Sequence, residues 1–200
     1  MDTLTRYKER AGDRALLDEI LDEAKVATVS TVVDGLPWSI PMLVTRHGDQ
    51  ILMHGSTGAG ALRHIAAGAP VTVSAFVVDG IVVADTLFDH SMNYRSAVLR
   101  GIIENADVTP REALNAFSDN ILPGRADEVR AHTDKELAAT LVLALPIVDG
   151  QWITKQRSGG PKADDAPDWT GHVPMRVVYD TPIGHTEGSI PASVRRLSDS

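Results

Sequence analysis

The chain has 200 residues, no cysteine and a formal net charge of -8, with 19 Lys and Arg against 27 Asp and Glu. Without cysteine it can form no disulfide, thiolate metal site or cysteine nucleophile. The acidic charge disfavours nucleic acid as a partner, because phosphate backbones attract basic surfaces. No apolar run approaches the ~18 residues of a membrane span, and the polar N-terminus does not resemble a secretory signal. We therefore expect a cytoplasmic protein with no membrane partner.

The first third of the sequence predicts a helix followed by three strands. Residues 13–24 place apolar side chains at helical spacing behind Asp13, a residue type that caps helices. Val26–Val33 and Leu36–Thr45 are rich in Val and Thr, and the Asp-Gly pair between them predicts a hairpin. Two prolines in Leu36–Thr45 predict an edge strand or a bulge, since proline cannot donate to a ladder. A third strand is expected over Gln50–Met53.

A stretch of small residues, 52–68, connects that third strand to a helix. Gly55, Gly58 and Gly60 allow sharp turns and leave backbone amides uncovered. Thr57 is placed to cap the helix, and Gly68 to end it. A loop of free amides at a helix N-terminus suits a phosphate or another anion. The alternative is an ordinary strand–helix connection that binds no ligand.

The rest of the sequence alternates strands and helices. Strands are expected over 71–78 and 81–84, joined by a turn at Asp79-Gly80, and over 94–106. Capping boxes at 109–112 and 133–136 predict two helix starts, and 140–148 with 151–157 predict a hairpin. A last short strand is expected within 173–179. The pattern predicts a mainly β (α+β) antiparallel barrel with peripheral helices. It is expected to form one domain, 13–180, between tails at 1–12 and 181–200.

The chemistry of the side chains excludes several common sites. Seven histidines show no metal-binding spacing, so no metal site is predicted. The sequence has no Gly-x-Ser-x-Gly elbow, and its glycine loop lacks the Walker and Rossmann patterns. His54 is the candidate catalytic residue, because it ends a strand beside the glycine loop and an imidazole titrates near neutral pH. The alternative for His54 is a half-buried ring bonded to backbone.

Four motifs in order give the sequence a family resemblance. They are residues 54–57 (His-Gly-Ser-Thr), 90–96 (His-Ser-Met-Asn-Tyr-Arg-Ser, followed by Gly101), 152–161 and 169–174. Across residues 13–179 the sequence resembles the pyridoxamine 5'-phosphate oxidase-like family. Within that family it is similar to the flavin-nucleotide-binding branch, which includes nitroimidazole-resistance reductases.

The resemblance implies a six-stranded FMN-binding split barrel that forms a homodimer with two flavin sites at the interface. It implies that the flavin ring lies along the second and third strands, here Ser39, Ile40, Pro41, Met42, Leu43 and Val44, with Met53 and His54. The phosphate would be held by Gly55, Ser56, Thr57, Gly60 and Arg63. Ser96, early in the long strand, would approach the ring system. Beside it, Tyr94 is a further cofactor-binding candidate, and Arg95 is a candidate cation for the phosphate. The partner subunit would contribute Trp152, Lys155 and Arg157.

These implications predict an FMN-dependent oxidoreductase that acts on a small molecule. The sequence departs from the family at Ala59 and Gly60, where many members carry arginine or lysine. Losing that charge-assisted contact would weaken phosphate binding by about 1.5–3 kcal/mol, unless amides and a redirected arginine replace it. Two alternatives therefore stay open: a deazaflavin as cofactor, and a non-enzymatic flavin or haem carrier on the same barrel. Oxidation of pyridoxamine 5'-phosphate itself is disfavoured, because no basic cluster for a substrate phosphate is evident.

Overall fold

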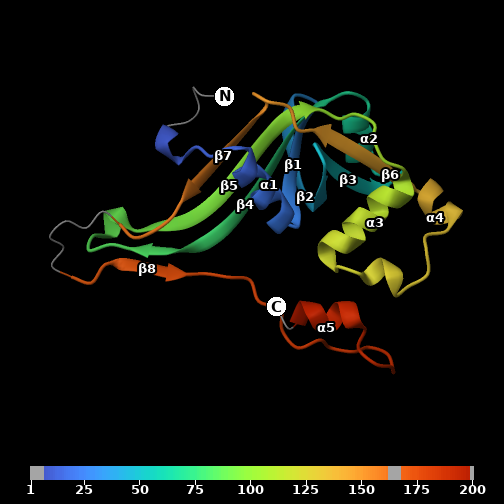
Figure 1. The fold of residues 1–200 in the computed structure, drawn as a ribbon. Helices are drawn as coiled ribbons and strands as arrows, with labels where there is room; N and C mark the ends of the chain where they lie inside the picture. The colour runs from blue at the N-terminus through green and yellow to red at the C-terminus, as the bar shows by residue number, and fades with distance from the viewer. Residues whose placement is uncertain (1–6, 162–167, 199–200) are drawn as a thin grey trace.

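A curled antiparallel sheet flanked by short helices forms the body of the protein (Figure 1). The structure is a computed structural model that describes residues 7–161 and 168–198. The strands are β1 (Val26–Val33), β2 (Leu36–His47), β3 (Gln50–Ser56), β4 (Pro70–Val83), β5 (Ser91–Ile102), β6 (Thr140–Pro146), β7 (Trp152–Arg157) and β8 (Gly171–Pro174). The α-helices are α1 (Arg14–Glu23), α2 (Gly60–Ala66), α3 (Pro110–Ile121), α4 (Asp134–Ala138) and α5 (Ala192–Ser198). Short 3₁₀ turns are η2 (Lys8–Arg10), η3 (Leu87–Asp89) and η4 (Arg125–Asp127).

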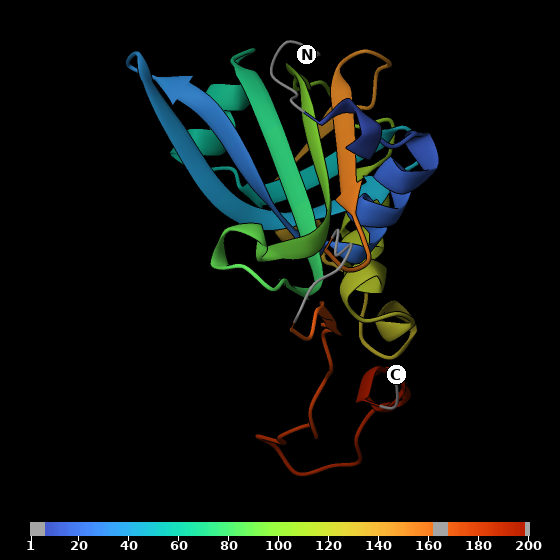
Figure 2. The ribbon, with the colours of Figure 1, turned by 90° about the vertical axis from the view of Figure 1, so that its left-hand side faces the viewer.

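The sheet curls until its two ends come close. Its strands lie in the order β6-β3-β2-β1-β4-β5-β7, and β8 pairs with the last part of β4. An isolated bridge between Glu104, just after β5, and Ala144 in β6 links distant parts of this path. The result is a half-barrel, whose curl is visible in Figure 2. The described residues contain eight strands, whereas the family resemblance implies a six-stranded barrel.

The predicted turn at Asp79-Gly80 is wrong, because β4 runs straight through it. Gly80 pairs with Asn93 of β5 and with Pro174 of β8, and the register shifts between Val78 and Gly80. A Cβ added at Gly80 would lie 2.6 Å from the Val173 carbonyl oxygen. The glycine therefore serves a bulge and the close approach of β8, which are alternatives to a turn for an isolated glycine in a strand.

The predicted hairpin between 140–148 and 151–157 is also wrong, although its turn is present. Gly150 has a φ of 80°, as a tight turn requires. The two strands that leave it do not pair with each other, because β6 pairs with β3 and β7 pairs with β5. The turn instead carries the chain across the mouth of the half-barrel.

Local sequence signals determine the starts of α1, α3 and α4 and the first hairpin as predicted. The Asp13 side chain accepts a hydrogen bond from the Leu16 amide, and both capping boxes form, at Thr109 and at Thr133. The β1–β2 turn has positive φ at Asp34 (51°) and Gly35 (77°). That conformation suits the right-handed twist of the two strands.

Two apolar clusters hold the layers together. In the larger cluster, α1 buries Leu17, Ile20 and Leu21, each at most 1% exposed, inside the half-barrel. The smaller cluster joins α3, through Ala113 and Phe117, to the other face of β3 and β6. Strand β3 is therefore covered on both faces, and α3 is the cover on its outer face.

The C-terminal segment leaves the sheet after β8 and ends in α5 (Figure 2). The backbone amide and hydroxyl of Ser193 both donate to the Glu128 carboxylate, at 2.9 and 2.5 Å. These bonds lower the pKa of Glu128 to about 2. The domain boundaries at 12/13 and 180/181 stay predictions. Within the described ranges, no helix is long and apolar enough to cross a membrane.

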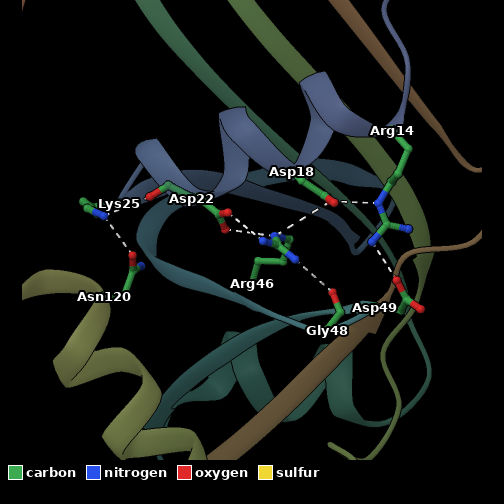
Figure 3. A network of polar contacts seen from close by, with 8 residues as sticks. All are labelled: Arg14, Asp18, Asp22, Lys25, Arg46, Gly48, Asp49 and Asn120. Carbon is green, nitrogen blue, oxygen red and sulfur yellow. Dashed lines mark hydrogen bonds and ion pairs between the residues drawn. The ribbon is translucent and has the colours of Figure 1, made fainter. Parts of the chain in front are cut away.

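A polar network fixes α1 to the β2–β3 turn and to α3 (Figure 3). Arg46 of β2 donates twice to the Asp22 carboxylate, at 2.9 and 2.6 Å, and lies 3.8 Å from Asp18. Lys25 donates to the side-chain oxygen of Asn120 at 2.8 Å. The Asn120 amide in turn donates to the backbone carbonyl of Val44 at 3.2 Å. Asn120 thereby connects α3 to the point in β2 on which the candidate site depends.

We expect Asn120→Ala to lower the free energy of unfolding by about 1–3 kcal/mol, because it leaves the Val44 carbonyl and Lys25 without this partner. Urea unfolding followed by circular dichroism measures the change. Asn115→Ala is the matched control. It makes the same exchange at an exposed position of α3 and should stay within about 0.5 kcal/mol of the wild type. Equal losses in both variants would contradict the assigned role of Asn120.

Candidate functional site

Strand β2 changes its pairing partner between Leu43 and Val44. Residues 36–43 pair with β1, whereas 44–47 pair with β3. The Val44 amide donates to the Lys25 carbonyl at 3.2 Å, which stabilises this transition point. Beyond Met53, β3 continues along β6 alone as far as Ser56. The two segments that the resemblance assigns to a flavin ring therefore begin where these strands separate.

The prolines of β2 explain why one edge of residues 36–43 stays unpaired. Pro37 lies opposite Val32 and Pro41 lies opposite Thr28, both in β1. Proline has no N–H to offer to a second neighbour, so it is tolerated on an edge strand. The predicted edge character is confirmed for this half of β2.

Alternation along β2 separates two sets of the predicted ring-binding residues. Ser39, Pro41 and Leu43 are exposed on the outer face. Trp38, Ile40 and Met42 point the other way, where they meet Leu62 and Ile65 of α2. The cavity left among these inner side chains measures about 10 Å³, too little for anything larger than a water molecule. A flavin ring can therefore approach only from the outer face.

His54 lies on the outer face of β3, under α3. Its ring centroid is 4.3 Å from that of Phe117, with 60° between the planes. Burial lowers the pKa of His54 below its ordinary value, so the neutral imidazole is favoured at neutral pH. Its Nδ1 is buried and has no hydrogen-bond partner in the described residues. A buried polar atom without a partner is uncommon, and because Nδ1 is closed off, a ligand could reach this ring only through its other nitrogen.

The glycine loop differs from the prediction in its hydrogen bonding. Thr57 does not cap α2, because the cap position is Ala59 and no side chain bonds there. The amides of 57, 58 and 59 are already bonded, to the Ala139 carbonyl, the Ser56 hydroxyl and the Ser56 carbonyl. The first helical bond runs from the Arg63 amide to the Ala59 carbonyl, at 3.0 Å. The amides left open are therefore those of 60–62, one turn later than expected.

The space around Gly60 is open, and a cation lies nearby in sequence. A Cβ added at Gly60 would meet no atom within 4 Å. Arg63 is exposed, and its side chain makes no hydrogen bond or ion pair with the residues described. By contrast, Gly55 is packed closely, because a Cβ there would collide with Leu62.

Arg95 is committed elsewhere. It donates to Asp79 at 2.7 and 3.0 Å, to Glu19 at 2.7 Å and to Glu23 at 2.6 Å. These carboxylates raise the pKa of Arg95, with Asp79 the strongest influence. Its role is to join α1 to β4 and β5, and the guanidinium has little capacity left for a phosphate.

Among the other predicted residues of β5 and β7, Trp152 faces the core. Tyr94, Ser96, Lys155 and Arg157 lie on the opposite face of the sheet. Tyr94 lies opposite Arg157, and Ser96 lies opposite Lys155. Arg157 also donates to the Asn93 side chain at 2.9 Å. Trp152 packs against the main core, and its indole N–H has no partner among the described residues.

Tyr94, Ser96, Lys155 and Arg157 do not meet the β2–β3 group within one chain. Strands β1 and β4 lie between β2 and β5. At about 4.8 Å per strand the separation is roughly 14 Å. Contacts of both groups with one flavin ring would therefore need a second copy of the chain.

Sequence reasoning missed two larger cavities. One, of about 810 Å³, opens at the barrel mouth and is lined by the ends of four strands, with Arg100 and Glu104 among its polar residues. The other, of about 780 Å³, lies between the end of α1, β4 and residues 175–179. It includes Phe76, which is 66% exposed. The sequence did hold a signal for this cavity. Phe76 continues the alternation of Thr72 and Ser74, so an aromatic side chain stands on the polar face of the strand. In the described ranges, no group of three or more acidic or histidine side chains could hold a metal ion.

A family model described as pyridoxamine 5'-phosphate oxidase matches residues 13–152, more than half of the chain. The chain belongs to the pyridoxamine 5'-phosphate oxidase family. The resemblance inferred from the four motifs is thus confirmed. A comparison with functionally curated proteins gives no match.

Solved structures extend the family assignment. The chain is 42% identical to a FAD and heme binding protein from Mycobacterium smegmatis, with a TM-score of 0.88 and coverage of 94% of this chain and 97% of that one. It is 27% identical to the flavocytochrome Anf3 from Azotobacter vinelandii, with a TM-score of 0.84 and coverage of 96% and 94%. A 5-nitroimidazole antibiotic resistance protein from Bacteroides thetaiotaomicron shares the fold at 19% identity, with a TM-score of 0.58 and coverage of 72% and 83%.

We expect the pKa of His54 to lie below the ordinary histidine value, because burial disfavours the imidazolium. The unfolded chain then binds more protons, so the contribution of His54 to stability is lost as the pH falls through about 6.5, the unfolded value. Phe117→Leu should move the pKa back toward its ordinary value. NMR titration of the imidazole C–H signals of His54 measures both changes. A His54 midpoint at the ordinary histidine value of about 6.5 would contradict the described burial.

Proposed function

We propose that the protein is a flavin-dependent oxidoreductase whose flavin ring lies on the outer face of the sheet, where β2 and β3 separate. The observation that carries the proposal is the change of partner at Val44, beyond which one edge of residues 36–43 has no strand beside it in the described chain and Ser39, Pro41 and Leu43 are exposed. The inner side is excluded by the packing of α2. Family membership supports a flavin as the bound group.

The phosphate is proposed to lie at the open amides of 60–62, with Arg63 as its cation. Basic residues are missing at Ala59 and Gly60, and Arg95 is already paired with three carboxylates. Arg63 is the exposed, uncommitted guanidinium of α2, so it takes the role that the resemblance assigns to the missing residues. Backbone amides supply the remaining donors.

The flavin would supply hydride or electron transfer, while the protein supplies orientation and hydrogen bonds. His54 is proposed to contact the flavin or the substrate through Nε2, because its Nδ1 is buried. The lowered pKa keeps the ring neutral, so it can donate from one nitrogen and accept at the other. A deazaflavin or a purely carrying role would differ by its spectrum, or by lack of turnover with NAD(P)H.

The nucleotide attached to the flavin is the next question for this site. The resemblance implies FMN, whereas the 42% identical relative is described as binding FAD. Acid release followed by chromatography of the purified yellow protein separates the two. Either nucleotide agrees with the proposed ring position, and a colourless protein that binds neither would overturn it.

A homodimer is proposed to complete the site. Its support is the roughly 14 Å between β2 and β5 in one chain, together with exposed apolar side chains on the outer face of the sheet. These are Val26 at 51%, Leu43 at 38% and Phe76 at 66% exposure. A second copy that covers this face would bring its own Tyr94 and Lys155 toward the flavin.

A haem is the second group that we propose the chain carries, in addition to the flavin. The specific support is the 42% identical M. smegmatis protein, which is described as binding both FAD and heme. The match to that protein covers 94% of this chain. The flavocytochrome Anf3, at 27% identity, has a similar fold along 96% of the chain. Histidine nitrogen and exposed apolar side chains are the protein groups that a haem needs.

Gly60→Asp tests the phosphate position. The added carboxylate meets no atom of the protein, and an acidic residue suits the first helical turn, so the fold should be kept. Its repulsion of the phosphate should weaken FMN and FAD binding by at least about tenfold, or 1.4 kcal/mol. Gly60→Ala is the control and should bind nearly as the wild type does. Flavin fluorescence quenching measures both affinities, and equal affinities would place the phosphate elsewhere.

Phe76→Glu tests the dimer. Sedimentation equilibrium should give about 43 kDa for the wild type, twice the 21.5 kDa of one chain, and a single-chain mass for the variant. Flavin affinity should fall with dimerisation, because each site would lose the partner's residues. Val129→Glu, at another exposed apolar position (45%), should remain dimeric. A wild-type protein of single-chain mass that still binds flavin would contradict the dimer proposal alone.

A further inference from the structure

His90 is held in an orientation that suits coordination of a metal ion through Nε2. Its Nδ1 lies 2.7 Å from the Thr86 carbonyl oxygen. A carbonyl can only accept, so Nδ1 carries the proton and Nε2 keeps its lone pair. The exposed Nε2 has no partner in the part of the chain that the structure describes. Metal-binding histidines commonly donate their other ring nitrogen to a backbone carbonyl in this way.

The turn before His90 is closed by its own hydrogen bonds. Residues 87–89 form the 3₁₀ turn η3, capped by Thr86, whose hydroxyl donates to the Asp89 carboxylate at 2.6 Å. The Asp89 amide donates back to the Thr86 hydroxyl at 3.2 Å. These bonds fix the Thr86 carbonyl that orients His90, so the imidazole is preorganised.

The surface around His90 is apolar and exposed. Leu87 and Phe88, at the tip of η3, are each 93% exposed. On the sheet, Ile81 pairs with Met92 on one side and with Val173 on the other. These three side chains therefore form one row across β5, β4 and β8, and they are 44–51% exposed.

His90 lies at the edge of this row. It precedes Met92 by two residues in an extended conformation (φ -57°, ψ 142°), so its side chain and that of Met92 point to the same side. Trp169, 69% exposed, lies against Gly171 of β8, at the next position along the ladder. A flat apolar ring could thus lie on this surface with one axial nitrogen supplied by His90.

Three other histidines, His54, His64 and His172, lack this combination. His64 is bonded through Nε2 to the Val32 carbonyl at 2.9 Å. His54 is covered by Phe117 and has a buried Nδ1. His172 is exposed on β8, and its ring makes no hydrogen bond within the described residues. An oriented imidazole beside a broad apolar surface is found at His90.

On this basis, which rests on the haem candidate of the proposed function, we infer that His90 is an axial ligand of the haem iron. Nε2 donates its lone pair to the iron, and no atom is oxidised or lost. The row formed by Met92, Ile81 and Val173, together with the η3 tip, contacts the porphyrin. Within one chain, the haem would therefore lie at the end of β4 and β5 near β8, apart from that chain's β2–β3 flavin site.

Haemin titration of purified protein, followed by the Soret band and by electron paramagnetic resonance, tests the assignment. The wild type should bind one haemin per chain with a histidine-ligated spectrum. His90→Ala should lose that spectrum and bind haemin at least about tenfold more weakly, and added imidazole should restore the signal. His172→Ala and His185→Ala are the matched controls and should behave as the wild type.

The outcomes separate the two levels of the proposal. A His90→Ala protein with an unchanged spectrum would overturn the ligand assignment and leave haem binding in place. A wild type that takes up no stoichiometric haemin would overturn both, while the flavin absorbance tests the flavin site independently. Phe88→Ser removes an apolar contact with the porphyrin and should weaken haemin binding. The ligation spectrum should stay unchanged, because His90 is kept. Circular dichroism checks that each exposed-site variant is folded.

Discussion

The separation of β2 from β3 at Val44 is the constraint on which the site depends. Val44 is 1% exposed, and its backbone groups are held by Lys25 on one side and Asn120 on the other. Pro37 and Pro41 then remove donors from the continuing edge, so β3 cannot follow β2 further. If β3 paired along the whole of β2, no unpaired edge would face the glycine loop, and a flavin ring would have no place against the backbone.

In this acidic protein, most of the arginines near α1 are paired with carboxylates of that helix. The carboxylates of α1 form ion pairs with arginines of the sheet. Asp18 and Asp22 pair with Arg46, and Glu19 and Glu23 pair with Arg95. These pairs fix α1 over the half-barrel and leave few free cations. Arg63 is one guanidinium outside them, at the helix that follows the glycine loop. An anion held there therefore depends on backbone amides more than on a positive field.

Local signals in the sequence predicted local structure well. The caps at Asp13, Thr109 and Thr133 and the Asp34-Gly35 turn each depend on a few neighbouring residues, and all were confirmed. The errors at Asp79-Gly80 and at the β6–β7 turn have a shared cause. Which strand lies beside which is decided by distant parts of the chain, β8 and β3, and no window around the turn contains them.

In the candidate site, too, the features that depend on neighbouring residues were predictable, and those that depend on distant parts of the chain were not. Motif order identified the family, and with it the segments around His54 and along β2. The sequence could not show that Arg95 is occupied by three carboxylates from two elements, or that the amides of 57–59 are already bonded. His90 was visible as part of a motif, but the hydrogen bond that orients it and the apolar row beside it depend on the fold.

The most direct measurement of the central claim is the set of backbone amide chemical shifts that change when FMN or FAD is added to the apoprotein. The account predicts changes concentrated in residues 39–43, 54–56 and 60–63, on both sides of the point where β2 and β3 separate. Changes confined to the 810 Å³ cavity at the barrel mouth, around Arg100 and Glu104, would contradict it.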